Sequence, residues 1–355
     1  MEYKQLGNTG VFVSRICLGA MTFGGVGTLF EAIGGLAQHD VNALVDNSLD
    51  AGVNFVDTAN VYAAGESETL LGKALGTRRK DVVIASKVFG RMGPGANQVG
   101  LSRLHIMREA EASLLRLNTD YIDLYQIHGF DALSPLEETL GALTDLVRQG
   151  KVRYIGCSNL AAWQIMKSFG ISALGHLEKF ITLQAYYSLA GRELEREIVP
   201  MLIDQKMGLL VWSPLAGGFL TGKFTRAGGL DEAEKDARRG KFSFPPVNLD
   251  RGYAIVDALA AVGKRHDATV AQIALAWLLH QPSVTSVIIG AKKIGQLKDN
   301  LGAVDVKLDD ADLKELDAVS RLTPEYPGWM FQSDDRRPGQ VRDWSKFLNA
   351  SKASA

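Results

Sequence analysis

The segment NFVDTANVY (residues 54–62) combines a short apolar strand, a carboxylate at its end and a phenol just beyond it. A buried aspartate is costly unless a cation pairs with it, and the next two apolar runs supply candidates. The run 82–87 ends in a lysine and the run 121–128 ends in a histidine. If these runs are parallel strands of one sheet, the acid, the amine and the imidazole converge at one edge beside the phenol. The sequence therefore predicts a proton-transfer site at that edge.

The same unit of apolar strand, polar loop, amphipathic helix and glycine stop recurs along the chain. Continuous apolar strands that alternate with helices indicate parallel pairing, and eight of them predict a closed (β/α)8 TIM barrel. The alternative is a doubly wound open sheet with a glycine fingerprint directly after its first strand, which Gly24-Gly25-Val26-Gly27 matches poorly. The eight predicted strands are 15–19, 54–57, 82–87, 121–128, 152–159, 181–187, 208–213 and 286–290.

Five predicted helices begin at residues that favour helix starts. These residues are Asp40, Ser102, Ser134, Thr269 and Asp309, and Ser134 opens a capping-box pattern with a proline directly after it.

Segments outside the repeating unit complete the predicted architecture. Residues 7–10 lie between two short extended runs and indicate an N-terminal β-hairpin. Residues 249–266 predict an extra helix after the seventh strand, and a helix from Asp309 to Val319 follows the eighth. We expect a single domain over residues 1–355, with the barrel at about 15–301 and a C-terminal helix and tail at 309–355.

Two stretches of the sequence show neither the helical nor the strand pattern of apolar residues. Residues 216–246 interrupt the pattern and contain the charge run 231–239, which fits either a solvated surface loop or a flap over the barrel mouth. The tail carries Trp329-Met330-Phe331 and Trp344, which could either line the mouth or pack on the outside.

Composition narrows the class of partner. The formal charge is −1 and 46% of the residues are hydrophobic, so no overall field favours nucleic acid or an anionic membrane. The start lacks a signal-peptide pattern, and no uncharged apolar run reaches the roughly 20 residues that span a bilayer. We expect a cytoplasmic protein with a small-molecule partner. Cys17 and Cys157 lie in apolar runs and are expected to be buried thiols rather than a disulfide.

The four side chains at the predicted edge suit acid–base chemistry. A lysine ammonium at Lys87 favours the phenolate form of Tyr62, which makes that phenol a stronger acid, while Asp57 holds and neutralises the lysine. His128 can then donate a hydrogen bond to a carbonyl oxygen. Each residue alone has an ordinary structural explanation, such as a loop cap, a solvated amine, rim packing or a core histidine. Their conjunction on successive strands favours catalysis, and no nucleophile triad or metal-ligand spacing competes with it.

A proton donor aimed at a carbonyl also needs a hydride source, which the protein itself lacks. The loops after the last two strands of such a barrel commonly bind phosphate. Here they contain the small residues 213–218 with Lys223, and Gly290-Ala291-Lys292-Lys293 before the helix at Gln296, a pattern suited to a pyrophosphate and a further phosphate. Trp212 offers a flat surface for a nicotinamide ring, although it could also be a core tryptophan.

Together these residues resemble the aldo-keto reductase superfamily, from the hairpin to about Leu316. The similarity is closest to the bacterial branch that also resembles potassium-channel β-subunits, with which the chain shares Ser213-Pro214-Leu215-Ala216 and the pattern from Gly290-Ala291-Lys292 to Asn300. The resemblance implies a (β/α)8 barrel, reduction of aldehydes or ketones with NADPH, and a catalytic tetrad of Asp57, Tyr62, Lys87 and His128. It also implies cofactor contacts through Ser158, Asn159 and Gln184 at the carboxamide, Trp212 at the nicotinamide, Ser213, Leu215, Gly217 and Lys223 at the pyrophosphate, and Lys292, Gln296 and Asn300 at the adenosine end.

Two positions differ from the pattern more usual in that family. Gly129-Phe130-Asp131 follows His128, where the family often has tryptophan or arginine and then proline, which changes the floor of the expected substrate pocket. Lys293 replaces a common small hydroxyl residue and adds positive charge near the expected 2′-phosphate, which favours NADPH over NADH.

The resulting hypothesis is an NADPH-dependent carbonyl reductase acting on a small-molecule carbonyl or alcohol. The alternatives are an alcohol or sugar dehydrogenase working in the oxidative direction and a redox-sensing regulatory subunit that turns over slowly. Aromatic and methionine residues in the loops 21–23, 89–92 and 129–130 and in the C-terminal tail favour an apolar or bulky carbonyl compound.

Overall fold

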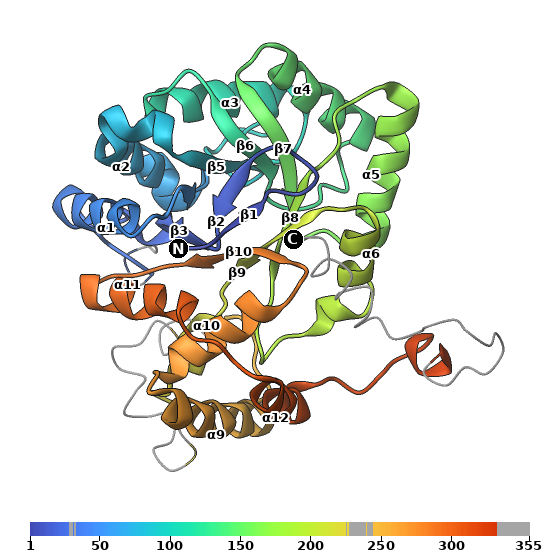
Figure 1. The fold of residues 1–355 in the computed structure, drawn as a ribbon. Helices are drawn as coiled ribbons and strands as arrows, with labels where there is room; N and C mark the ends of the chain where they lie inside the picture. Colours follow the sequence, from blue (N-terminus) through green and yellow to red (C-terminus); the bar gives the residue numbers. More distant parts are fainter. Residues whose placement is uncertain (28–30, 32, 225, 227–238, 240–243, 332–355) are drawn as a thin grey trace.

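The centre of the protein is a closed barrel of eight parallel strands (Figure 1). The computed structural model describes residues 1–27, 31, 33–224, 226, 239 and 244–331. Strand β10 (Val284–Ile289) pairs with both β3 (Ile16–Gly19) and β9 (Gly208–Trp212), which closes the sheet. The predicted TIM barrel is therefore confirmed and the open sheet is excluded. The strands are β3 (Ile16–Gly19), β4 (Phe55–Asp57), β5 (Val83–Val88), β6 (Ile122–Ile127), β7 (Val152–Ser158), β8 (Thr182–Tyr186), β9 (Gly208–Trp212) and β10 (Val284–Ile289).

Helices surround the barrel and cover its outer face (Figure 1). Those that follow successive strands are α1 (Gln38–Asp50), α2 (Glu66–Leu75), α3 (Arg103–Leu117), α4 (Leu136–Arg148), α5 (Ala162–Gly175), α6 (Ile198–Asp204), α10 (Val270–His280) and α11 (Ile294–Leu301). The two predicted extra helices are confirmed as α9 (Leu249–His266), which precedes α10, and α12 (Asp310–Ser320), which packs on α9. In α4, Leu136, Leu140 and Leu143 are buried because positions i, i+4 and i+7 share one face.

Three of the predicted helix caps are present. The Ser102 hydroxyl accepts from the backbone of α3, and Thr269 and Asp309 each form a capping box at the start of α10 and α12. The prediction for Asp40 is wrong, because α1 begins earlier and Ala37 is its N-cap. The Asp40 carboxylate lies in the first turn, where it still complements the helix dipole.

The predicted capping box at Ser134 is also wrong. Pro135 is the N-cap of α4, and the Ser134 hydroxyl instead donates to the Asp131 carboxylate at 2.8 Å. Asp131 also accepts from the backbone N–H groups of Leu101 and Leu133. The loop before α4 is therefore organised around the Asp131 carboxylate, which sequence patterns for helix capping do not predict.

The predicted hairpin, β1 (Tyr3–Gln5) and β2 (Phe12–Ser14), closes the amino-terminal end of the barrel (Figure 1). Leu6 is fully buried and packs with inward-facing residues of the strands, including Phe55 and Leu124. The Lys4 amine donates to the carbonyl of Pro282, just before β10, and to that of Val284, the first residue of β10. Gly7 is required at the turn, because a Cβ there would lie 2.2 Å from the carbonyl oxygen of residue 181 and its φ is +59°.

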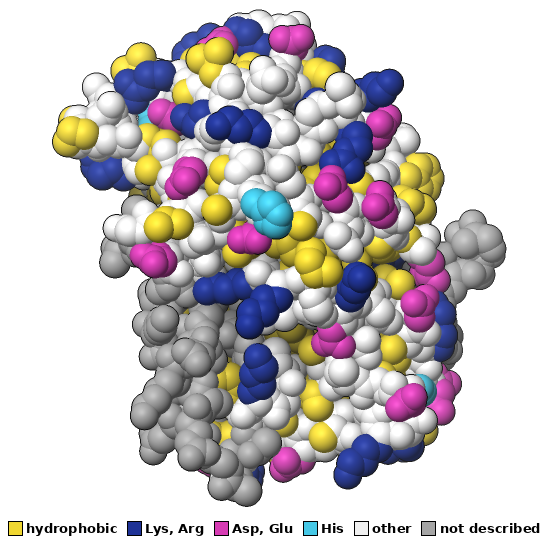
Figure 2. All heavy atoms as spheres, turned by 90° about the vertical axis from the view of Figure 1, so that its left-hand side faces the viewer, with side chains coloured by type: hydrophobic (Ala, Val, Ile, Leu, Met, Phe, Trp, Pro, Cys, Tyr) yellow, Lys and Arg dark blue, Asp and Glu magenta, His cyan; other side chains and the backbone are white. Residues whose placement is uncertain are grey.

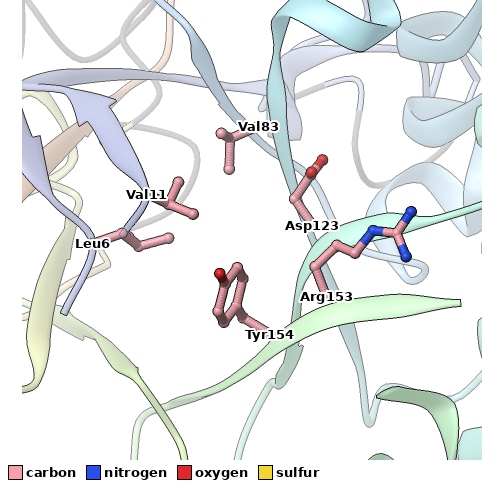
Figure 3. A pocket seen from close by; sticks show the side chains of 6 residues that line it. All are labelled: Leu6, Val11, Val83, Asp123, Arg153 and Tyr154. Carbon is pink, nitrogen blue, oxygen red and sulfur yellow. The ribbon is translucent and has the colours of Figure 1, made fainter. Parts of the chain in front are cut away.

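A pocket of about 310 Å³ lies beneath this hairpin, at the amino-terminal ends of β5, β6 and β7 (Figure 3). It is lined by Leu6, Val11, Val83, Asp123, Arg153 and Tyr154. Its charged groups bind other parts of the protein: Asp123 Oδ2 accepts from Arg79 Nη2 at 2.8 Å, and Arg153 donates to the Gly150 carbonyl at 3.0 Å. The pocket is at the opposite end of the strands from Asp57 and belongs to the barrel floor.

The aperiodic segments are described in part. The loop after β9 begins with a turn at Ala216–Thr221, while most of the predicted charge run, and Trp344, lie outside the described residues. Trp329 and Met330 are exposed on the short turn Gly328–Phe331, which lies away from the barrel in Figure 1. Of the two alternatives for these two side chains, the structure favours an outside position.

The surface and the cysteines agree with the composition. Figure 2 shows positive and negative side chains interspersed over one face of the molecule. Within the described ranges, no helix is both long enough and apolar enough to cross a bilayer. Cys17 and Cys157 are free and buried, as predicted, and burial raises the pKa of both thiols.

Candidate active site

An acid and an amine meet at the carboxyl-terminal end of the barrel. Asp57 is the last residue of β4 and Lys87 lies near the end of β5, and the register of these strands pairs Asp57 with Ala85. Lys87 Nζ donates to Asp57 Oδ1 at 2.5 Å and to the Thr58 carbonyl at 2.8 Å, and neither side chain of the ion pair is appreciably exposed. Burial disfavours the ammonium, but the charge of Asp57 and the facing Tyr62 outweigh burial and raise the pKa of Lys87. The amine therefore remains charged.

Two amides hold the other oxygen of the carboxylate. Asp57 Oδ2 accepts from Gln184 Nε2 at 2.7 Å and from Gln126 Nε2 at 3.3 Å. The three residues come from β4, β6 and β8, so they form one inward layer from alternate strands. Gly156 makes room for this layer, because a Cβ there would lie 3.2 Å from Gln126 Cγ and 2.5 Å from the Thr182 hydroxyl. Asp57 is thus held in position by one cation and two amide donors.

The phenol reaches the amine from a tight turn after β4. The Tyr62 hydroxyl lies 3.4 Å from Lys87 Nζ, and the amine lies 5.0 Å from the centre of the Tyr62 ring. The turn uses left-handed backbone at Ala63 (φ 49°) and Ala64 (φ 54°), which alanine adopts only under constraint. Tyr62 is thereby aimed at Lys87.

His128 lies beside Tyr62 at the carboxyl-terminal opening of the barrel, which we call the mouth. Its ring meets the Tyr62 ring edge to face, with centroids 5.7 Å apart. Burial and the Lys87 ammonium lower the pKa of His128 to about 3. The imidazole is therefore neutral near pH 7 and offers one N–H donor. The structure thus brings together all four residues that the sequence nominated for catalysis.

A hydrogen-bonded chain connects His128 to Trp212. Asn159 Nδ2 donates to the His128 carbonyl at 3.0 Å and to Ser158 Oγ at 2.9 Å. Asn159 Oδ1 accepts from Trp212 Nε1 at 3.0 Å, and Ser158 Oγ donates to the Gln184 carbonyl at 2.9 Å. Asn159 has left-handed backbone, with φ 60°. Ser158, Asn159 and Trp212 therefore line one side of the mouth, while the side-chain amide of Gln184 points to Asp57.

Trp212 has aromatic neighbours that the sequence did not reveal. Phe244 stacks on the indole, with centroids 5.6 Å apart and planes 11° from parallel, and Tyr186 lies against it at 5.2 Å. The buried Arg239 donates to the carbonyls of Ala216 and Pro245, which ties the segment that carries Phe244 to the loop after β9. Part of the predicted stacking surface is therefore covered by a side chain of this protein.

The loop after β9 is a compact series of turns with left-handed residues. Ser213 and Ala216 both have φ 50°, and Gly217 N–H donates to Ser213 Oγ at 3.0 Å. A Cβ on Gly217 would lie 2.5 Å from the Phe244 carbonyl oxygen, so the position requires glycine. Pro214 is buried and Leu215 is half-buried within these turns, and Lys223 is exposed just beyond them.

The loop after β10 leads into α11 with exposed cations. Gly290, Lys292 and Lys293 are exposed, and the Lys292 N–H donates to Gln296 Oε1 at 2.9 Å. Asn300 is buried on α11. The two predicted phosphate loops thus follow neighbouring strands, because β9 pairs with β10.

Three residues at the site were missed by the sequence reasoning. Gln126 could have been found, because it precedes His128 by two positions and so shares its face of the strand. Tyr186 follows Gln184 by the same rule. No sequence pattern pointed to Phe244 as a site residue, because it lies in the stretch 216–246, which has no helix or strand pattern. Across the described part of the chain, no cluster of three or more His, Cys, Asp or Glu side chains could hold a metal ion.

A parallel eight-stranded barrel with this convergence of acid, amine and phenol at its carboxyl-terminal face has the architecture of a barrel enzyme with a proton-transfer site. Sequence comparison makes the assignment specific. The model of the Aldo/keto reductase family matches residues 15–321, and the chain belongs to this family.

The relatives include proteins named as an oxidoreductase or a reductase and a protein named as a channel subunit. The chain is 36% identical over 344 residues to the uncharacterized oxidoreductase YrpG of Bacillus subtilis, covering 93% of this chain and 100% of that protein. It is 36% identical over 335 residues to a probable voltage-gated potassium channel subunit beta of Arabidopsis thaliana, covering 92% and 99%. It is 34% identical over 349 residues to versiconal hemiacetal acetate reductase of Aspergillus parasiticus, covering 92% and 99%.

Proposed function

We propose that this protein reduces an aldehyde or ketone to an alcohol with NADPH. The observation that carries the proposal is the position of Lys87 Nζ, 2.5 Å from the Asp57 carboxylate and 3.4 Å from the Tyr62 hydroxyl. A buried ammonium with one anionic partner and one phenolic partner is suited to stabilising a phenolate. The family and the name of the A. parasiticus relative, a reductase, support the same direction.

In this mechanism Tyr62 is the general acid. Its hydroxyl gives a proton to the substrate oxygen, and the Lys87 ammonium stabilises the phenolate that remains. Asp57 keeps the lysine charged and in place, helped by the amides of Gln126 and Gln184. The neutral His128 donates a hydrogen bond to the substrate oxygen and fixes its direction. In the oxidative direction, the phenolate accepts the proton from an alcohol.

The residues along the mouth fit a nicotinamide dinucleotide. The half-buried indole of Trp212 provides a flat surface for stacking, although Phe244 covers part of it. The left-handed turns from Ser213 to Gly217 provide a close-packed cradle, and the exposed Lys292 and Lys293 provide positive charge. When bound, NADPH supplies the hydride. Ser158 and Asn159 would contact the carboxamide end. The remaining cofactor residues are Pro214, Leu215, Ala216, Lys223, Gly290, Gln296 and Asn300.

The test is a screen of NADPH oxidation with aldehydes, ketones, sugars and quinones, with product identification. We expect turnover with at least one carbonyl class, most readily an apolar or bulky one, and recovery of the alcohol. Failure across the whole panel, with NADPH bound, would count against the proposal.

Cofactor preference has its own test. Lys292→Ala should weaken NADPH binding more than NADH binding, because the two differ by a 2′-phosphate. Equal effects on both cofactors would contradict the assignment of this end of the site.

A second candidate is a redox-sensing regulatory subunit, favoured by the plant β-subunit relative. It predicts rapid oxidation of bound NADPH in one turnover followed by slow release of NADP+. Steady turnover at the single-turnover rate would exclude it.

A further inference from the structure

A buried polar network lies behind the candidate site, between the barrel wall and helices α2 and α3. Its members are Glu68, Ser86, Glu109, Arg116 and Asn60, and we refer to them as the buried network. Arg116 Nε donates to Glu68 Oε2 at 2.6 Å, and Arg116 Nη2 lies 3.8 Å from Glu109 Oε2. Glu68 and Glu109 are almost completely buried. Buried carboxylates are retained only with partners, so the positions of these groups are strongly fixed.

The network contacts both segments that carry the proposed catalytic groups. Ser86, directly before Lys87, donates its hydroxyl to Glu68. Asn60 lies between Asp57 and Tyr62, and its Nδ2 donates to Glu109 Oε2 at 3.1 Å. The Asn60 backbone N–H also donates to the Lys87 carbonyl at 3.2 Å. One residue thus connects the Tyr62 loop to the lysine strand and to α3.

The network also supports the turn that aims the phenol. After Tyr62, left-handed backbone continues through Ala63 and Ala64 to Gly65 (φ 96°). A Cβ on Gly65 would lie 2.6 Å from Arg116 Cδ, so the Arg116 side chain packs directly on the turn. Conformations of this kind persist only where surrounding contacts enforce them. The turn is held on one side by Asn60 and on the other by Arg116, and Glu109 contacts both residues.

We propose that Glu109 is a positioning residue, which acts through Asn60 and Arg116 to hold the Tyr62 hydroxyl beside Lys87. The inference rests on the proposed role of Tyr62 and names a determinant of catalysis outside the barrel mouth. Glu109 does not touch the mouth, so its effect should fall on turnover and not on binding.

The experiment measures kcat and KM with NADPH and 4-nitrobenzaldehyde, or with the best carbonyl of the panel, together with the Kd for NADPH. Glu109→Ala should lower kcat by about 10²-fold, as expected for a misplaced catalytic group, and leave the cofactor Kd and KM within a few-fold of wild type. Glu109→Gln keeps an oxygen acceptor for Asn60 and should recover most of the lost kcat.

Two further variants complete the design. Asn60→Ala removes the same hydrogen bond from the other side, so it should reproduce the kcat loss, and the double variant should be no slower than either single variant. Glu111→Ala is the matched control, because Glu111 lies on the same helix but is exposed and pairs with Lys151. It should leave kcat unchanged.

The inference is overturned if Glu109→Ala keeps kcat within twofold of wild type, or if its loss of kcat is matched by loss of NADPH binding. If Glu109→Ala does not fold, Asn60→Ala decides by the same criteria. Tyr62→Phe is measured in parallel to separate the two hypotheses. Full turnover by Tyr62→Phe would refute the proposed function, whereas an inactive Tyr62→Phe with an active Glu109→Ala would refute this inference alone.

Discussion

Replacing Lys87 with methionine separates the effect of its charge on stability from its effect on catalysis. The variant removes an ammonium 2.5 Å from Asp57 Oδ1 and 3.4 Å from the Tyr62 hydroxyl. Removing one partner of a buried ion pair costs about 3–5 kcal/mol of unfolding free energy, because the other charge stays buried. The amides of Gln126 and Gln184 still contact Asp57, so we expect the lower end of that range.

The catalytic magnitude follows from the distance between Lys87 Nζ and the Tyr62 oxygen. Unit charges 3.4 Å apart interact by about 5 kcal/mol at an effective dielectric constant of about 20. Loss of that stabilisation of the phenolate corresponds to a decrease in kcat of about 10³-fold to 10⁴-fold. The assay is stopped-flow oxidation of NADPH in a single turnover, with denaturant unfolding in parallel.

The informative control is the double variant Asp57→Asn with Lys87→Met, which removes both charges. It should be more stable than Lys87→Met, because no unpaired carboxylate remains, yet its kcat should be equally low. The reasoning is refuted if Lys87→Met keeps kcat within about tenfold of wild type. It is also refuted if the double variant is no more stable than Lys87→Met.

Three further predictions follow from the site. The pKa of His128 is lowered to about 3 in the folded protein. Below about pH 6.5 this histidine is therefore protonated in the unfolded chain but stays neutral in the folded protein. Its contribution makes the free energy of unfolding decrease as the pH falls from about 6.5 toward 3. At pH 5 the penalty is about 2 kcal/mol, and denaturant unfolding of His128→Gln should show a weaker pH dependence. Gly156→Ala should lower the unfolding free energy by about 1–3 kcal/mol and displace Gln126, and unchanged stability would contradict the packing. Phe244→Ala should strengthen NADPH binding by about 2-fold to 10-fold in fluorescence titrations, because it exposes the Trp212 surface, whereas Trp212→Ala should weaken it.

The parts of the fold that follow a regular period were predictable from the sequence. The barrel, the hairpin and both extra helices could be predicted because apolar strands and amphipathic helices alternate with glycine stops. Helix starts were less certain: α1 begins at Gln38 and not at Asp40, because first-turn carboxylates and true caps give the same local signal.

Contacts between distant segments determine the remainder of the site. The convergence of Asp57, Lys87 and His128 follows from strand ends in a parallel barrel. The hydrogen bond from Asn60 to Glu109 depends on how α3 is turned about its own axis where it packs on the barrel strands. No local sequence pattern determines that orientation. The stacking of Phe244 on Trp212 brings together two residues that are distant in the sequence, and it could not be inferred from spacing.

The most direct test concerns Tyr62 as the proton donor beside Lys87. The measurement is the rate constant of NADPH oxidation in a single turnover by Tyr62→Phe, with NADPH binding measured on the same sample. The predicted result is a cofactor Kd close to that of wild type and a rate constant lower by at least about 10²-fold, the contribution expected of general acid catalysis. A Tyr62→Phe variant that binds NADPH and oxidises it at the wild-type rate would contradict the account.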